Sequence, residues 1–270
     1  MFKKLLTTTV MSVAALGVSA SIAAADVLED VEERGTLIAG VKADYPPFGY
    51  RSDDGDIVGL EIDLAEDIAE RLGVDIELVP VVASNRMEFL DQGKIDVVIA
   101  TMTNTEEREK VVDFVEPGHY ASGTNILAPK KAGFTEWGDL EGKPVCGVQG
   151  AFYNRRTQQE YGAEMIAFKG TAEAYTALQQ GRCLAFVYDD AALLGQLDKD
   201  AWSEFEMPLE TIDESPWGMA VATGEDNFRE KLTEIVIDWH GSGKILELEE
   251  EYGINNTPYA KRMHEEYKDN

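Results

Sequence analysis

The stretch from residue 95 to residue 114 constrains the fold more than any other part of the chain. It begins with a short apolar run at 95–100, which predicts a buried strand. Thr105-Glu106-Glu107 then provides the hydroxyl cap and the acidic first turn that are typical of a helix start. A strand that leads through polar residues into a helix indicates an open α/β sheet. Such sheets bind their ligands beyond the carboxyl ends of the strands.

An arginine falls in the first turn of this predicted helix. Arg108 would project close to the carboxyl end of the strand, near Thr101 and Thr103. Hydroxyl groups, free N–H groups of a helix start and a guanidinium fork together suit a bound carboxylate. A capped helix with a solvated arginine is the alternative, and the residues by themselves leave both interpretations open.

This stretch resembles the signature of the polar amino-acid-binding proteins of ABC importers, the bacterial extracellular solute-binding proteins of family 3. In that family the arginine at the position of Arg108 holds the α-carboxylate of the ligand. The residues at the positions of Thr101 and Thr103 contact the α-carboxylate and the α-ammonium. The resemblance covers nearly all of the chain after residue 25. It implies an α/β fold of two lobes, the type II periplasmic binding protein fold, with two hinge strands.

Residues 1–25 have the features of a secretory signal peptide. Two lysines precede an apolar run at 10–22, and three alanines at 23–25 offer a small-residue cleavage site. The apolar run is too short and too rich in serine and alanine to favour a membrane anchor. We therefore expect an exported, periplasmic protein.

The chain is strongly acidic. Its 51 acidic and 24 basic residues give a net charge of −27, which becomes −29 without the two lysines of residues 1–25. Such a charge argues against nucleic acid and anionic lipid as partners. The three histidines and two cysteines show no metal-ligand spacing, so we expect no metal and no cofactor.

Two predicted strands connect the lobes. One, at 125–129, leads out of the first lobe, and the other, at 217–223, returns to it. The second lobe is then an insertion at 129–218, and the first lobe consists of 26–128 and 219–270.

Residues 42–48 follow a predicted strand and contain two prolines, which cannot continue the interior of a sheet. In the resembling family the first aromatic residue here, Tyr45, covers the side chain of the ligand; ordinary packing beside a turn is the alternative. Lys42 stands where binders of cationic amino acids or glutamine usually have aspartate and glutamate/aspartate binders have arginine. A buried lysine would repel a cationic ligand, whereas a lysine that extends to solvent would not.

The glutamate/aspartate-binding subgroup is the closest in motif. There the arginine at the position of Arg86 reaches the distal carboxylate of the ligand, although a surface ion pair is the alternative. Asp189 corresponds to the aspartate that pairs with the α-ammonium, whereas the adjacent Asp190 suits a helix cap. Thr171 replaces a histidine of the subgroup, which weakens the case for an acidic ligand.

Two pairs of residues in the second lobe complete the predictions, one for ligand binding and one for a disulfide bond. Gly150 and Ala151 stand in a loop where most relatives have Gly-Thr-Thr, and their N–H groups, at a helix start, could bind a carboxylate. Cys146 and Cys183, the only cysteines, fall on two predicted strands of this lobe. In an exported protein such a pair indicates a disulfide bond.

The resemblance implies a monomeric substrate-binding protein that delivers a free α-amino acid, with an acidic or amide side chain, to an ABC permease in the inner membrane. A dehydratase-like enzyme of the same fold would need an acid that faces the ligand. Glu61 and Glu173 are the acids to consider, but nothing in the sequence singles them out, so we expect no catalytic residue. A ligand-sensing receptor domain would require a membrane span after residue 250, where the sequence is polar.

Overall fold

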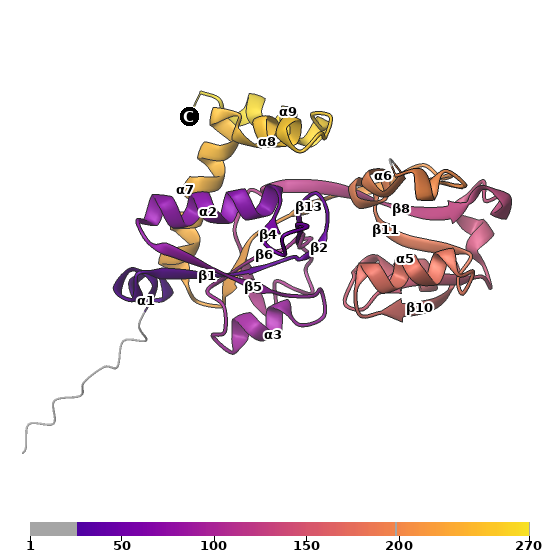
Figure 1. Cartoon of the computed structure of the whole chain (residues 1–270). Coiled ribbons are helices and arrows are strands. Elements are labelled where there is room, and N and C mark those ends of the chain that lie inside the picture. The colour runs from indigo at the N-terminus through magenta and orange to yellow at the C-terminus, as the bar shows by residue number, and fades with distance from the viewer. Residues whose placement is uncertain (1–25, 198, 270) are drawn as a thin grey trace, which may run out of the picture.

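Two β-sheets, each flanked by helices, form the two lobes of the molecule (Figure 1). The computed structural model describes residues 26–197 and 199–269, so the predicted signal peptide lies outside the described residues. The predicted fold class, an α/β protein of two lobes, is confirmed.

The first lobe is built on a five-stranded sheet. In order across the sheet, its strands are β5 (Asp75–Pro80), β1 (Thr36–Val41), β6 (Val97–Ile99), β14 (Ala220–Ala222) and β7 (Val112–Phe114). Its helices are α1 (Val27–Arg34), α2 (Leu60–Leu72), α3 (Arg86–Asp91) and α7 (Asp226–Ser242). Strand β1 runs parallel to both of its neighbours and is largely buried, as its apolar sequence predicts. Helix α2 buries Leu64 and Ile68 and ends at Gly73, whose φ of 70° lies in the left-handed region that favours glycine.

A small three-stranded sheet lies beside this lobe. It consists of β2 (Asp44–Tyr45), β3 (Gly49–Arg51) and β4 (Ile57–Val58). The residue pair Asp44 and Tyr45, which the sequence placed in a loop after β1, therefore forms a short antiparallel strand with β3.

The second lobe is built on a sheet of mixed direction. In order, its strands are β10 (Glu164–Phe168), β9 (Pro144–Val148), β11 (Ala185–Asp189), β8 (Tyr120–Pro129) and β12 (Phe205–Glu206). Its α-helices are α4 (Tyr153–Gln159), α5 (Thr171–Gln179) and α6 (Asp190–Leu197), and its 3-10 helices are η1 (Lys130–Ala132), η2 (Trp137–Leu140) and η3 (Asp200–Trp202).

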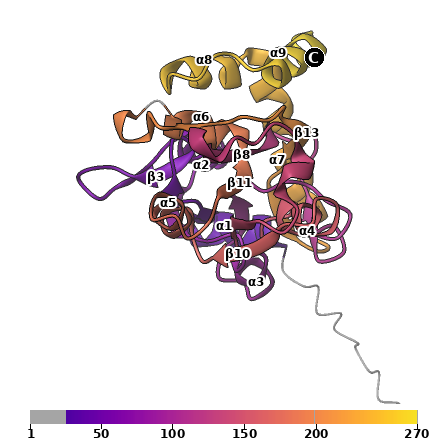
Figure 2. The ribbon, with the colours of Figure 1, turned by 90° about the vertical axis from the view of Figure 1, so that its right-hand side faces the viewer.

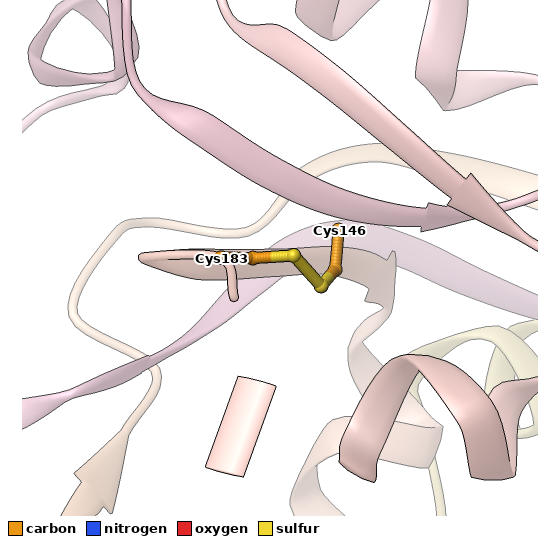
Figure 3. The surroundings of a disulfide bond; sticks show 2 residues. All are labelled: Cys146 and Cys183. Carbon is orange, nitrogen blue, oxygen red and sulfur yellow. A yellow bond between two sulfur atoms is a disulfide. The ribbon is translucent and has the colours of Figure 1, made fainter. Parts of the chain in front are cut away.

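The predicted disulfide bond is present in this lobe. Cys146 lies in β9 and Cys183 lies just before β11, with their Cα atoms 5.5 Å apart (Figure 3). Both residues are buried, so the bond joins β9 to the segment that leads into its parallel neighbour β11, inside the core.

Strands β8 and β13 (Ile212–Trp217) form the connection between the lobes and pair in antiparallel fashion. The sequence predicted one return strand at 217–223. The structure divides it at Gly218: β13 ends at Trp217, and β14 begins at Ala220 in the sheet of the first lobe. The N–H group of Gly218 donates to the carbonyl of Met102, which fixes the break.

The chain ends in two helices, α8 (Lys244–Glu251) and α9 (Pro258–Tyr267), which lie together at the top of Figure 2. The sequence after residue 250 was described only as polar, and helix α9 was not predicted from it. Thr257 caps α9 by accepting from the N–H group of Ala260, and Pro258 occupies the first turn. Among the helices described, none has the length and apolar character that a membrane span requires.

Candidate functional site

Charged side chains from both lobes converge on one small cavity. Its lining residues are Lys42, Ala83, Arg86, Thr101, Thr103 and Arg108 from the first lobe and Ala151, Phe152, Tyr153, Tyr188 and Asp189 from the second. The structure thus brings together seven of the nine predicted site residues, and the other two, Tyr45 and Gly150, contact members of this set. The cavity measures about 20 Å³, little more than the space of one water molecule, because the lobes are drawn together.

Arg108 connects the two lobes. The predicted helix around it is wrong, because the chain makes two successive turns and enters β7 at Val112. The carbonyl of Thr105 accepts from the N–H groups of Arg108 and Glu109, and the carbonyl of Arg108 accepts from those of Val111 and Val112. The buried guanidinium donates through Nη1 to the carbonyl of Thr103 at 2.6 Å. Through Nη2 it donates to the carbonyl of Gly150 in the second lobe at 3.0 Å. Its position at the carboxyl end of β6 is as predicted, although a turn and not a helix holds it there.

Thr101 has an unusual backbone that a buried carboxylate stabilises. Its φ of 47° lies in the left-handed region, which is uncommon for a β-branched residue. The N–H group of Thr101 donates to both carboxylate oxygens of Glu61, at 2.8 and 3.0 Å. Glu61 is fully buried and also lies 2.9 Å from Nε2 of His119. Glu61 therefore positions Thr101, a supporting role that no local pattern in the sequence could reveal.

Arg86 is a buried cation at the start of α3. Its Nη1 donates to the carbonyl of Ala100 at 2.5 Å and to that of Thr101 at 3.3 Å. Among the described residues its Nε has no hydrogen-bond partner, and no carboxylate forms an ion pair with it. Burial, together with the nearby charge of Arg108, lowers the pKa of Arg86 to about 9. The alternative of a surface ion pair is therefore wrong.

Lys42 does not extend to solvent, since its side chain is only 2% exposed. Its Nζ lies 2.7 Å from Oδ1 of Asp44. Burial by itself would raise the pKa of Asp44, but the ammonium of Lys42 and the hydrogen bonds from Thr171 outweigh it, so the pKa lies below its usual value. The positive charge that the sequence assigned to the site is thus partly balanced within the protein.

Asp189 ends β11 on the opposite side of the cavity. Tyr45 donates a hydrogen bond of 3.0 Å from its hydroxyl to Oδ2 of Asp189. Burial raises the pKa of Asp189 to about 7, although this hydrogen bond acts in the opposite direction. The adjacent Asp190 begins α6, and its Oδ1 accepts from the hydroxyl of Ser122 and the N–H group of Gly123.

Tyr45 itself does not line the cavity. Its ring packs against the rings of Phe48, Tyr188 and Trp217, with centroid distances of 5.6, 5.3 and 5.9 Å. The ring therefore packs in the core, as the alternative interpretation had it, while the hydroxyl reaches a site residue. The predicted contact of Tyr45 with the side chain of a ligand stays a prediction.

Gly150 and Ala151 differ from the prediction in how they use their backbone groups. The N–H group of Ala151 donates to the carbonyl of Val148 at 3.1 Å, and α4 begins only at Tyr153. Gly150 instead offers its carbonyl to Arg108. Its φ is 82°, and a Cβ atom there would lie 2.8 Å from backbone atoms of Ala83, so the approach of the lobes requires glycine. The N–H group of Ala151 is thus used within the loop, and the predicted contact of this pair with a bound carboxylate stays a prediction.

Known proteins are similar to this chain over most of its length. A model of the bacterial extracellular solute-binding proteins, family 3, matches residues 37–255. The chain belongs to this family. The glutamine-binding protein of Geobacillus stearothermophilus is 34% identical over 78% of this chain and 82% of the relative. The L-cystine-binding protein of Escherichia coli K12 is 31% identical over 86% of this chain and 88% of the relative. Among solved structures, a mutant of the arginine-binding protein of T. maritima has a TM-score of 0.79 at 30% identity and covers 84% of this chain and 99% of its own.

Three aromatic residues of this solute-binding protein were missed from the sequence. Phe152, Tyr153 and Tyr188 line the cavity from the second lobe. Tyr153 and Phe152 belong to the loop in which the sequence departs from the Gly-Thr-Thr of relatives, so the departure itself was the signal. Tyr188 directly precedes Asp189, and the alternation of a strand would place it on the other face.

The two acids considered for catalysis do not line the cavity. Glu61 is buried and contacts the N–H group of Thr101 and Nε2 of His119. Glu173 is exposed and accepts from the N–H group of Lys169. Among the described residues no group of histidine, cysteine, aspartate and glutamate side chains could hold a metal ion.

A larger cavity, of about 810 Å³, lies on the other side of the hinge. Residues of β8, of α6 and of the segment 252–259 line it, together with Pro46 and Pro47. Its described lining includes a single basic residue, Lys199, and no arginine, so it lacks the guanidinium groups that suit a carboxylate. Size alone therefore does not identify the ligand site in this solute-binding protein.

Proposed function

We propose that this chain is the substrate-binding component of an amino-acid ABC importer, which captures a free α-amino acid between its lobes. One observation carries the proposal. Arg108 from the first lobe and Asp189 from the second lobe line the same buried cavity with opposite charges. An α-amino acid has a carboxylate and an ammonium on adjacent atoms, so it complements such a pair in a way that a simple carboxylate or a sugar does not.

The α-carboxylate and the α-ammonium of the ligand then have defined partners in the protein. Arg108, Thr101 and Thr103 bind the α-carboxylate, in exchange for the carbonyl contacts that Arg108 now makes with Thr103 and Gly150. Asp189 binds the α-ammonium, and the hydroxyl of Tyr45 orients its carboxylate. Gly150 and Ala151 form the loop that meets Arg108 when the lobes close.

Lys42 and Arg86 select the side chain of the ligand. Arg86 favours a ligand side chain that ends in an oxygen atom, whether carboxylate or amide. Its guanidinium is buried and, among the described residues, donates only to carbonyl groups. A cationic side chain would meet the guanidinium of Arg86, which has no ion-pair partner among the described residues, and the ammonium of Lys42, whose charge Asp44 balances in part. A contact between two like charges in a closed site costs several kcal/mol at about 4 Å. The glutamine-binding and L-cystine-binding relatives fit a polar side chain of this kind.

The mechanism follows from the division into lobes. With its cavity of about 20 Å³, the closed molecule cannot admit an amino acid, so the lobes must part about β8 and β13 and close again on the ligand. We take the first lobe to comprise 26–128 and 219–270, and the second 129–218. Residues 1–25 direct export to the periplasm, and the closed monomer delivers its ligand to a permease in the inner membrane.

We propose a binding role and no enzymatic one: Glu61 and Glu173 do not line the cavity, and Asp189, which does, is assigned to the α-ammonium of the ligand. The test of binding is a thermal-shift panel of the twenty amino acids. A ligand at 100 times its Kd adds about 2.7 kcal/mol of stability. We expect glutamate, aspartate or glutamine to raise the melting temperature, with lysine and arginine ineffective. If no amino acid raises it, the proposal is wrong, and if arginine does so best, the role of Lys42 and Arg86 is wrong.

A further inference from the structure

Asp44 lies between the candidate site and the second lobe. One of its carboxylate oxygens, Oδ1, is 2.7 Å from Nζ of Lys42, which lines the cavity. Its other oxygen, Oδ2, faces α5 of the second lobe, 127 positions further along the chain. Strand β2, which contains Asp44, and helix α5 lie on facing sides of the two lobes (Figure 1).

The contact with α5 is made by its first residue, Thr171. The N–H group of Thr171 donates to Oδ2 of Asp44 at 3.2 Å. The hydroxyl of Thr171 lies 3.0 Å from the same oxygen and 2.7 Å from the carbonyl of Asp44, so it donates to one of them at a time. Thr171 is only 1% exposed. A Cβ atom at the preceding Gly170 would lie 3.1 Å from Oδ2, so a glycine there gives the carboxylate room to approach.

We propose that Asp44 is a positioning and specificity-determining residue: one oxygen balances the charge of Lys42 in the site, and the other holds the second lobe closed through Thr171. The inference rests on the proposed function and narrows its substrate class to α-amino acids with an amide side chain, ahead of those with a carboxylate.

The first consequence concerns closure. The bonds between Asp44 and Thr171 join opposite lobes, so they exist only while the lobes are together. They stabilise the closed state for any ligand, and their loss raises the rate of release more than it lowers the rate of capture.

The second consequence concerns selectivity. A side-chain carboxylate of the ligand would compete with Asp44 for Lys42. If Lys42 turned toward that carboxylate, Asp44 would stay largely enclosed with Thr171 as its partner and without a countercharge, which is unfavourable. An amide side chain is neutral, so Lys42 keeps its ion pair with Asp44 when such a ligand binds. Asp44 thus disfavours an acidic ligand relative to its amide analogue.

Two substitutions separate these consequences. Thr171→Val keeps the shape of the side chain and the Lys42–Asp44 pair but removes the hydroxyl. Asp44→Asn removes both the charge that balances Lys42 and the charged acceptor for Thr171. Thr176→Val is the matched control, because Thr176 lies on the same helix and its hydroxyl bonds only within α5, to the carbonyl of Ala172.

Affinities for glutamine and glutamate are measured by titration calorimetry, and release rates by stopped-flow fluorescence. Since a hydrogen bond to a charged group is involved, we expect Thr171→Val to weaken both ligands alike, by roughly 10-fold or more and mainly through release. We expect Asp44→Asn to weaken glutamine but to raise the ratio of glutamate to glutamine affinity about 10-fold. Thr176→Val should change neither.

If the ratio of glutamate to glutamine affinity is the same in wild type and Asp44→Asn, the role of Asp44 in selectivity is overturned. If Thr171→Val releases the ligand at the rate of wild type, the role of Asp44 in closure is overturned. If wild type binds neither amino acid, the acidic or amide side chain assigned to the ligand is wrong, and if no amino acid binds, the proposed function itself has failed. The closure contact is then judged separately. Small-angle X-ray scattering of the protein alone should show a larger radius of gyration for Thr171→Val than for wild type, and equal radii would overturn it.

Discussion

Lowering the pH from 8.5 to 5.5 should weaken the binding of an α-amino acid through one residue, Asp189. This carboxyl is 6% exposed, and burial raises its pKa to about 7. The α-ammonium of the ligand needs the ionised carboxylate. At pH 8.5 nearly every molecule has that form, whereas at pH 5.5 protonation has removed most of it, because the pH is then below the pKa.

The size of the effect follows from the pKa. At 1.5 units below a pKa of 7, about 3% of Asp189 is ionised, so the apparent Kd should rise roughly 30-fold between pH 8.5 and pH 5.5. Over the lower part of that range, binding of the ligand should release close to one proton. The free energy of unfolding of the ligand-free protein depends on pH in the opposite direction: through Asp189, stability is greater at low pH. The native carboxyl keeps its proton up to about pH 7, so this contribution to stability is present below pH 3.8 and is lost as the pH rises through 7.

Titration calorimetry in two buffers of different ionisation enthalpy measures the Kd and the number of protons released. The matched variant is Asp189→Asn, which should bind weakly and with the same Kd at both pH values. The reasoning is refuted if the Kd of wild type changes less than about threefold between pH 5.5 and pH 8.5. It is also refuted if Asp189→Asn retains the full pH dependence, because another group would then be titrating.

Three further predictions concern the site, the disulfide and the surface. Arg108→Ala should weaken the binding of any α-amino acid by at least about 100-fold, since it leaves a desolvated carboxylate without its partner, whereas Arg51→Ala, at an exposed arginine, should not. Calorimetry that places Arg108→Ala within threefold of wild type would contradict the assignment. Removing the disulfide in the double variant Cys146→Ser/Cys183→Ser opens a loop of sequence separation 37 and should lower the free energy of urea unfolding by about 4 kcal/mol in the chain-entropy model, and unreduced wild type should react with no alkylating agent. Raising the salt from about 0.1 M to 1 M shortens the Debye length from ~10 Å to ~3 Å and should relieve the self-repulsion of a chain of net charge −27. A gain of about 1 kcal/mol in the free energy of unfolding would raise the melting temperature by roughly 2–4 °C. A fall in the melting temperature would show that salt weakens attractive ion pairs more than it relieves the repulsion.

Local sequence patterns were sufficient where neighbouring residues decide the structure. The strand before residue 42 was predicted and is present as β1, Thr36–Val41, because parallel strands inside a sheet are apolar on both faces. The approach of Arg108, Thr103 and Asp189 to one cavity was also predicted, since the family motif places each at the carboxyl end of a strand. The disulfide followed from export and from two cysteines on neighbouring strands.

Local patterns failed where a distant segment decides the structure. Thr105-Glu106-Glu107 has the composition of a helix start, but the chain makes only two turns, because β7 must begin at Val112 to pair with β14, about a hundred positions away. The return strand was likewise divided at Gly218 by a hydrogen bond to Met102.

The sequence by itself determined the class of fold, the disulfide and the charged residue types of the site, because periodicity, export and the family motif are local properties. Only the tertiary structure decided how those charges are used. Lys42 is balanced by Asp44, Asp44 reaches Thr171 across 127 positions, and Glu61 supports the backbone of Thr101. Glu61 and Thr101 meet only when the first lobe folds, and Asp44 and Thr171 meet only when the two lobes come together. Lys42 and Asp44 are close in the sequence, but the energy of their ion pair, like that of the other contacts, depends on burial that no stretch of sequence specifies.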